Sequence, residues 1–336
     1  MPRARKNLLS PSLGGVGFYH CVSRVVDRRF VFEVHERETF RKILRQVEAF
    51  SGVRVVTWTI LSNHFHLLLD VPPAEELDDA GILERCRELY SADGMSAVEW
   101  EYADAERMSG DVLERWRAKY LQRMWDLSEF MKTLKQRFTA WFNRKHTRSG
   151  TLWERRFTSV LVEGSWDCLL KVAAYIDLNA VRAGIVSDPK DYRWSGYAEA
   201  VGGDRRARRG LVSAMQLEKA GVDWRHVGAA YRRVIFGIGE SKGERKGISA
   251  EAVAEVWAAG GRLSFEQLLR CRVRYFTSGV VIGSTSFVEA FFAARREMFS
   301  IRRSSGARKL RGGDWGQLRT ARDLGLQPIA PPVSDG

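Results

Sequence analysis

Two histidines, His64 and His66, stand two positions apart in the apolar segment HFHLLLDV. The apolar residues predict a strand, and residues i and i+2 of a strand project from the same face of a sheet. Both imidazoles would therefore leave one face together, at a separation that suits two ligands of one metal ion. The alternative is a pair of half-buried, hydrogen-bonded histidines that only serve the fold.

A second group of polar residues lies along a helix predicted at residues 166–182. Tyr175, Asn179 and Arg182 follow one another at i, i+4 and i+7, so they share one edge of that helix. Tyr175 is a candidate nucleophile, Asn179 a candidate metal ligand through its amide oxygen, and Arg182 a candidate grip on a phosphate oxygen. The alternative is a core tyrosine beside a surface amide and a surface guanidinium.

Together these side chains fit transfer of a phosphoryl group to a tyrosine. A tyrosine hydroxyl, with a reference pKa of about 10, is a poor nucleophile at neutral pH and needs help. A divalent metal can polarise the scissile phosphate, and two histidines plus one amide oxygen leave coordination positions open for it. This ligand set suits Mg²⁺ or Mn²⁺ better than a structural zinc ion.

The charge of the chain points to a polyanionic partner. The net charge is +13 and the pI about 9.8, a balance that is typical of nucleic-acid-binding proteins. Residues 74–115 hold thirteen acids against four arginines, a net −9, so the remainder carries +22. The alternative is a basic protein without a specific partner.

Basic and aromatic residues alternate between positions 131 and 160. Eight Lys or Arg residues stand there against one acid, Glu154. This mixture suits single-stranded nucleic acid, because phosphates take the charge and bases stack on rings. We expect Trp141 and Phe142 to be core residues and Trp153 less so. The candidate DNA contacts are Arg24, Lys135, Arg144, Trp153, Arg155, Arg156 and Arg182.

The elements that must position these groups follow from hydrophobic periodicity. Their order is strand, helix, hairpin, helix, strand, helix, at residues 17–24, about 36–50, 53–61 with 64–71, about 120–146, 157–163 and 166–182. This order predicts an α+β fold, an antiparallel sheet with helices on one face. Further helices are predicted at about 213–236, 249–258, 264–274 and 286–299.

The predicted domains follow the same pattern. The chain is expected to hold a catalytic domain at 1–200 with an acidic helical insertion at about 74–120, a linker and helix at 201–247, a helical basic C-terminal region at 248–325 that is a candidate for DNA binding, and a disordered tail at 326–336.

Several protein classes are excluded by what the sequence lacks. No apolar run approaches the roughly 20 residues of a membrane span, and the basic N-terminus has no signal-peptide core. The four cysteines are scattered without a CxxC pair, which disfavours a disulfide framework and a cysteine zinc site. We therefore expect a cytoplasmic, nucleoid-associated protein.

Three motifs resemble those of one family. SNHFHLLLDVP at 62–72, GTLWERRF at 150–157 and YIDLNAVRAGIV at 175–186 together resemble the REP-associated tyrosine transposases, which are single-tyrosine HUH transposases of insertion sequences. The resemblance covers about residues 15–200. One departure is Ala180, which stands where the family usually has proline, and its presence should extend the helix.

The resemblance implies a ferredoxin-like sheet with the histidine pair on a central strand. It implies that Tyr175 forms a 5′-phosphotyrosine on single-stranded DNA, with Asn179 at the metal-ligand position. The implied substrate is a hairpin-forming palindrome that is cut on one strand. Alternatives are a domesticated DNA- or RNA-binding regulator without catalysis, and a metal-dependent nuclease that uses water. Both a monomer and a homodimer are compatible with the sequence.

Overall fold

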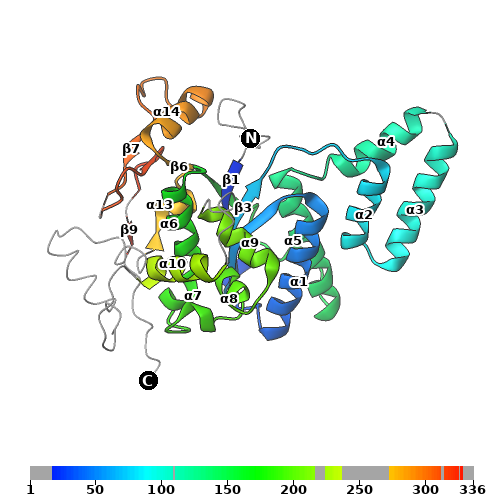
Figure 1. The fold of residues 1–336 in the computed structure, drawn as a ribbon, viewed down its shortest axis with the longest axis horizontal. Helices are drawn as coiled ribbons and strands as arrows, with labels where there is room; N and C mark the ends of the chain where they lie inside the picture. Colours follow the sequence, from blue (N-terminus) through cyan, green and yellow to red (C-terminus); the bar gives the residue numbers. More distant parts are fainter. Residues whose placement is uncertain are drawn as a thin grey trace.

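A computed structural model describes residues 17–108, 110–215, 224–236, 272–311, 314–324 and 326–327. Within these ranges a seven-stranded sheet runs through the molecule in the order β2-β3-β1-β4-β6-β8-β7 (Figure 1). Its strands are β1 (Gly17–Arg24), β2 (Arg54–Ile60), β3 (His64–Val71), β4 (Thr158–Val162), β6 (Val281–Gly283), β7 (Arg308–Lys309) and β8 (Arg319–Thr320). All neighbours pair antiparallel except β4 and β6, which are parallel. A separate short pair joins β5 (Arg272–Val273) to β9 (Leu326–Gln327).

The predicted hairpin lies at one edge of this sheet. β2 and β3 pair directly, and β1 lies on the other side of β3, with Val22 opposite His66 and Arg24 opposite His64. β3 is therefore hydrogen-bonded on both sides, and seven of its eight residues are buried. The strand that carries the histidine pair is held rigidly inside the sheet.

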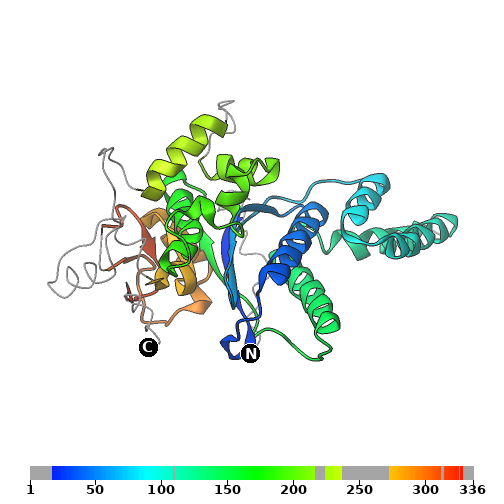
Figure 2. The same cartoon turned by 90° about the horizontal axis from the view of Figure 1, so that it is seen from below.

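Helices cover both faces of the sheet. Figure 2 shows the blue helix α1 (Val34–Ser51) on one side, and the green and yellow-green helices of residues 166–236 on the other. The α+β class is confirmed, but the helices do not lie on one face. The reason is the run of three leucines in β3, because Leu67 and Leu69 face one core while Leu68 faces the other. A strand that is apolar on both faces needs cover on both.

The remaining helices divide between an arm and the two layers. The acidic insertion is helical as predicted and projects from the sheet as an arm (Figure 1). Its helices are α2 (Asp79–Leu89), α3 (Ala92–Arg107) and α4 (Gly110–Leu121). The layers contain α5 (Leu127–Lys145), α6 (Trp166–Asp177), α7 (Asn179–Arg182), α8 (Gly196–Val201), α9 (Arg205–Ala214), α10 (Trp224–Phe236), α13 (Arg274–Ser278) and α14 (Thr285–Ala294), with 3-10 turns at Val26–Arg28, Pro189–Asp191 and Arg296–Met298.

The linker-like stretch at 202–210 is a packed helix. Most of it belongs to α9, which lies against β2. Gly210 makes this possible, because a Cβ at that position would meet the Val56 carbonyl oxygen at 2.4 Å. The prediction of a linker there was wrong, since a glycine that permits close backbone approach looks the same in sequence as one that gives flexibility.

The C-terminal region was predicted to be helical, and the described part of it contains strands. β6, β8 and β7 extend the sheet beyond β4, and α14 is the longest helix described beyond residue 270. The helix predicted at 249–258 lies outside the described residues, and the described end of the one at 264–274 contains β5. β6 is a three-residue run that ends at Gly283, too short to be recognised as a strand from its pattern. The division into domains stays a prediction.

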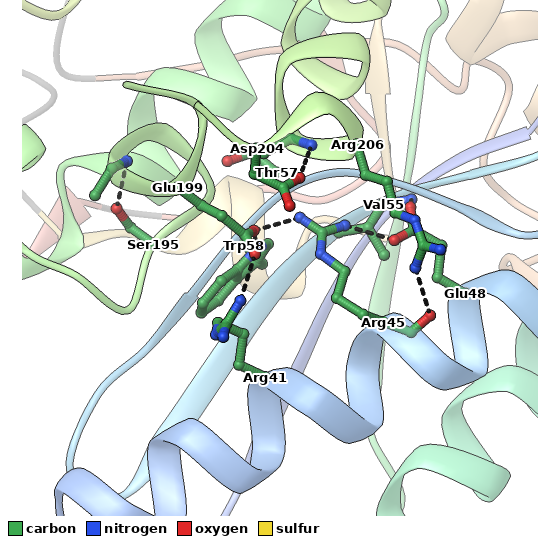
Figure 3. A network of polar contacts seen from close by, with 12 residues as sticks. Arg41, Arg45, Glu48, Val55, Thr57, Trp58, Ser195, Glu199, Asp204 and Arg206 are labelled. Atoms are coloured by element: carbon green, nitrogen blue, oxygen red, sulfur yellow. Dashed lines mark hydrogen bonds and ion pairs between the residues drawn. The ribbon is translucent and has the colours of Figure 1, made fainter. Parts of the chain in front are cut away.

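An ion-pair network ties α1 to β2 and α8 (Figure 3). Arg45 of α1 pairs with both Glu48 and Glu199, and all three side chains are largely buried. Glu199 also accepts a hydrogen bond from Trp58 Nε1 at 3.0 Å. Glu48 accepts one from the backbone N–H of Val55 at 2.7 Å. This network fixes the outer edge of the sheet against its helices.

Replacing Glu199 with alanine should destabilise the fold by about 3 kcal/mol or more, since it leaves the buried Arg45 and the Trp58 indole N–H short of a partner. The free energy of unfolding in urea measures this. The control is Glu99→Ala, which breaks an exposed pair with Arg87 and should cost at most about 1 kcal/mol. Equal losses in the two variants would mean that the network contributes nothing beyond a surface pair.

Candidate active site

The two histidines of β3 lie beside each other on the face that α6 covers. Their ring centroids are 5.2 Å apart. His66 is only 4% exposed, whereas His64, at the start of the strand, is half-buried. Burial, followed by the nearby His20 and His64, holds the pKa of His66 well below its usual value. At neutral pH His66 is therefore the uncharged imidazole, which is the form that binds metals.

Tyr175 approaches the histidines from α6. Its ring meets that of His66 edge-on at 6.3 Å, and Phe276 packs against it at 5.0 Å. The guanidinium of Arg182 lies over the ring, 4.0 Å from its centroid. Only 2% of the side chain is exposed, yet it lines a pocket that also contains both histidines. The ring is thus fixed from several sides.

The helix that carries these groups is not continuous. α6 ends at Asp177, and Leu178, with ψ near 2°, separates it from α7. The prediction that Ala180 would extend the helix was wrong. Asn179 explains the break, because its Nδ2 donates to the Ile176 carbonyl oxygen at 3.1 Å and so competes with the helical backbone pattern.

Asn179 and Arg182 contact each other as well as Tyr175. Arg182 Nη2 donates to Asn179 Oδ1 and, at 2.6 Å, to the Tyr175 carbonyl oxygen. Asn179 Nδ2 is held by the Ile176 carbonyl oxygen, and Asn179 lines the same pocket as the two histidines. An amide oxygen has two lone pairs, so one remains for a metal beside Arg182.

A buried carboxylate anchors the end of α6. Asp177 accepts hydrogen bonds from the Thr57 hydroxyl of β2 at 2.7 Å, from the Tyr231 hydroxyl of α10 and from the Tyr197 backbone N–H. Burial raises the pKa of Asp177 to about 7, against the opposing effect of these three donors. The anchor fixes α6, and with it Tyr175, relative to the sheet.

The pocket around these residues is cationic. It has a volume of about 380 Å³ and combines parts of β1, β3, α6 and α7 with the loop before β4 and the end of α13. One carboxylate, Glu154, lines it together with the cations Arg24, Arg28, Arg155, Arg156 and Arg182. Four of these arginines were predicted as DNA contacts. A concentration of positive charge in a hollow attracts polyanions.

A second hollow of about 770 Å³ lies between α5 and the segment 151–157. Arg155 and Arg156 line both hollows, so the two are adjacent, and Lys135 lines the second one. Arg144 is exposed near the end of α5 and is not among the residues that line either hollow.

Trp153, a candidate DNA contact that was expected to be less of a core residue than Trp141 and Phe142, is buried. It is 7% exposed and belongs to the core beside Phe138. Its Nε1 donates to the Thr139 hydroxyl at 2.8 Å, and Lys135 Nζ lies over its ring at 5.2 Å. A backbone bridge pairs Trp153 with Val25, and the indole packs against Phe65 of β3, tertiary contacts that composition does not reveal.

The sequence reasoning missed His20. This residue of β1 is 1% exposed and lies between the metal candidates and the C-terminal region. Its Nε2 is 2.9 Å from His66 Nδ1, and its Nδ1 is 2.7 Å from the carbonyl oxygen of Phe276. Burial lowers the pKa of His20 to about 4, so the ring is neutral. The sequence did show a histidine inside an apolar strand, which is unusual. It did not show that this histidine contacts His66, because that contact depends on how β1 and β3 pair.

The donor atoms fit a divalent cation. His64 Nδ1 lies 2.6 Å from the Asn63 amide oxygen, and His66 Nδ1 is engaged by His20, so each ring is oriented through its Nδ1. Hydrogen-bonding the second ring nitrogen is how proteins orient histidine ligands. Asn179 lines the same pocket as the two histidines, and their role as metal ligands stays a prediction.

Comparison with known proteins gives a family for part of the chain. Residues 17–80, from β1 to the start of the insertion, match the family model described as "Transposase IS200 like", and this match includes both histidines. The solved structures that resemble the chain include a REP-associated tyrosine transposase bound to a REP hairpin, with 14% sequence identity, a TM-score of 0.32, and coverage of 56% of this chain and 80% of that one. No curated protein matches.

No helix in the described ranges is long and apolar enough to cross a membrane. The match to the IS200-like model is confined to the segment that contains the histidine pair. On that match, residues 17–80 are similar to the IS200-like transposases.

Proposed function

We propose that this chain is a metal-dependent endonuclease and strand transferase for single-stranded DNA, with Tyr175 as its nucleophile. The convergence of β3, α6 and α7 on one cationic pocket carries the proposal. It brings a tyrosine, a histidine pair and an amide oxygen together, and this is the set that phosphoryl transfer to tyrosine requires. The match to IS200-like transposases supports the same chemistry.

The reaction divides into two exchanges at phosphorus. Tyr175 Oη attacks the scissile phosphate, the bond from phosphorus to the 3′ oxygen breaks, and a 5′-phosphotyrosine and a free 3′ hydroxyl result. The tyrosine proton passes to water, and the leaving oxygen takes a proton from water. Attack by the 3′ hydroxyl of another strand then restores a phosphodiester and frees Tyr175, so joining needs no ATP.

The chain's own groups bind and orient the phosphate. His64, His66 and Asn179 would hold Mg²⁺ or Mn²⁺, which supplies Lewis-acid polarisation of a phosphate oxygen. Arg182, placed over the Tyr175 ring, offers a cation both to the phosphate and to the negative charge that develops on the phenol oxygen.

The DNA would run across the two hollows. Arg24 and Arg182 lie at the catalytic pocket, and Arg155 and Arg156 continue toward the groove that Lys135 lines. The family resemblance favours a hairpin-forming palindrome as substrate, cut on one strand. Arg144 stands outside both hollows and would contact only DNA that extends past them.

A labelled hairpin oligonucleotide with a single-stranded flank tests this proposal. Incubated with the full chain and Mn²⁺, it should give a protein–DNA adduct that survives a denaturing gel, together with a free 3′ hydroxyl product. Cleavage without an adduct would replace the proposal with hydrolysis by water. Binding without any cleavage would replace it with a non-catalytic regulator.

Lys135 should make the salt dependence of DNA binding change with pH. Burial, with a contribution from Arg156, lowers the pKa of Lys135 to about 8. The ammonium is therefore present at pH 7 and lost as the pH rises through 8. If Lys135 neutralises a phosphate, the slope of log affinity against log salt should become shallower by about 0.6 between pH 7 and pH 9.

Fluorescence anisotropy at several salt concentrations measures that slope. Lys135→Arg should keep the pH 7 slope at pH 9, because a guanidinium stays charged. Lys132→Arg, at an exposed lysine one turn away, is the matched control and should behave like the wild type. A wild-type slope that does not change with pH would remove Lys135 from the DNA contacts.

A further inference from the structure

We propose that His20 is a positioning residue for the metal site, which, together with the backbone carbonyl of Phe276, fixes the tautomer of His66 that presents Nε2 to the cation. The inference rests on the proposed function, since the cation is the one that DNA cleavage would use. It adds a residue of β1 and a segment of the C-terminal region to the catalytic machinery.

The first step concerns the contact between His20 and Phe276. A carbonyl oxygen can only accept a hydrogen bond, so the 2.7 Å contact requires a proton on His20 Nδ1. The His20 ring is 1% exposed, so a second ring proton would place a charge in the core, and a singly protonated imidazole has one N–H. His20 Nε2 is therefore a bare acceptor.

The second step follows from that acceptor. His20 Nε2 is 2.9 Å from His66 Nδ1, and one of the two nitrogens must donate. Since His20 Nε2 accepts, His66 Nδ1 carries the proton. His66 is 4% exposed, and with its one ring proton on Nδ1 its Nε2 keeps a lone pair. The direction of both hydrogen bonds is therefore fixed: His66 donates to His20, and His20 donates to the Phe276 carbonyl oxygen.

The opposite tautomer of His66 would block the metal. With its proton on Nε2, the ring would present an N–H where the cation needs a lone pair. A ring whose Nδ1 has no acceptor can populate both tautomers. Metal affinity then falls because fewer molecules hold the binding tautomer and because the ring is less well oriented. Outer-shell partners of this kind typically change metal affinity by about 10- to 100-fold.

The C-terminal region supplies the fixed end of this chain of hydrogen bonds. Phe276 belongs to α13, 256 residues from His20 in sequence. α13 packs against β1 and β4, and β6 pairs with β4 directly beyond it. The Phe276 ring also touches Tyr175, and Thr277 and Ser278 line the pocket. One short segment thus supports both the nucleophile and a metal ligand.

His20→Phe and His20→Gln in the full chain test the proposal. Phenylalanine keeps a ring in the core but removes both polar atoms, and should weaken Mn²⁺ binding by about 10- to 100-fold in calorimetry. Glutamine can donate to Phe276 and accept from His66, and should stay within about threefold of the wild type. His35→Phe, at an exposed histidine of α1, should change nothing.

Nitrogen-15 NMR of the histidine rings without metal gives a second readout. His66 should have its proton on Nδ1 in the wild type and in His20→Gln, and populate Nε2–H in His20→Phe. Wild-type Mn²⁺ affinity in a folded His20→Phe variant, or Nε2–H on His66 in the wild type, would overturn the inference. If the wild type shows the Nδ1–H tautomer but binds no Mn²⁺, the proposed function fails while the assignment of the tautomer stands.

Discussion

Tyr175→Phe should abolish the covalent protein–DNA adduct and reduce strand cleavage by about 10³-fold or more, the size of loss found when a catalytic nucleophile is removed. The change deletes one oxygen and keeps the ring, so the contacts of that ring with Phe276 and Arg182 remain. Hairpin affinity should therefore stay within about threefold. Denaturing gels with end-labelled hairpin measure the adduct, and anisotropy measures the binding.

A tyrosine outside the pocket provides the control. Tyr102 lies on α3 of the insertion arm, and its hydroxyl contacts Glu106. Tyr102→Phe should form the adduct at the wild-type rate. If Tyr175→Phe still cleaves DNA at a comparable rate, water is the nucleophile and the proposal of a tyrosine-dependent strand transferase is wrong. Mass spectrometry of the digested adduct should find the nucleotide on the peptide that contains Tyr175.

The double change His64→Ala with His66→Ala should reduce cleavage by an amount of the same order, about 10³-fold, because Lewis-acid stabilisation by a metal is worth several kcal/mol. Metal binding should disappear with it. Hairpin binding should persist, since the arginines that line the pocket are untouched. Its affinity should retain the steep salt dependence of the wild type.

The two histidines differ in how cleanly they can be tested. His66→Ala leaves His20 Nε2 buried without its donor and should cost about 1–3 kcal/mol of stability. His64 is half-buried at the end of the strand, so His64→Ala alone separates loss of the ligand from loss of the fold. If hairpin binding vanished in folded protein along with cleavage, the histidine pair would be structural.

The core of the fold was predictable from sequence because its strands are long and strongly patterned. β1 and β3 have the predicted limits, and the hairpin with β2 follows from the short polar turn between two apolar runs. The C-terminal strands have two or three residues each, which is below the length at which periodicity distinguishes a strand. To predict helices on both faces of the sheet, one would have to know that the leucines of β3 face two different cores.

The site was predictable where its residues belong to one element or one motif. His64 and His66 share a strand face, and Tyr175, Asn179 and Arg182 share a helical edge despite the break at Leu178. His20 was out of reach, because it meets His66 only through the pairing of β1 with β3, and Phe276 only through the return of a distant segment. The burial of Trp153 was misjudged because tertiary contacts decided it.

The distance along the chain between His20 and Phe276 also determines when, during translation, their contact can form. At about 5–20 residues per second, the 256 residues between them take on the order of 10–50 s to translate. During that time β4 lacks its neighbour β6, and the imidazole of His20 has no carbonyl to hold it. Contacts of such long range also slow folding, because the closure of the loop must precede any gain from the contact. On the proposed function, a nascent chain that stops short of residue 276 would therefore lack the carbonyl that orients the metal site, and we expect it not to cut DNA.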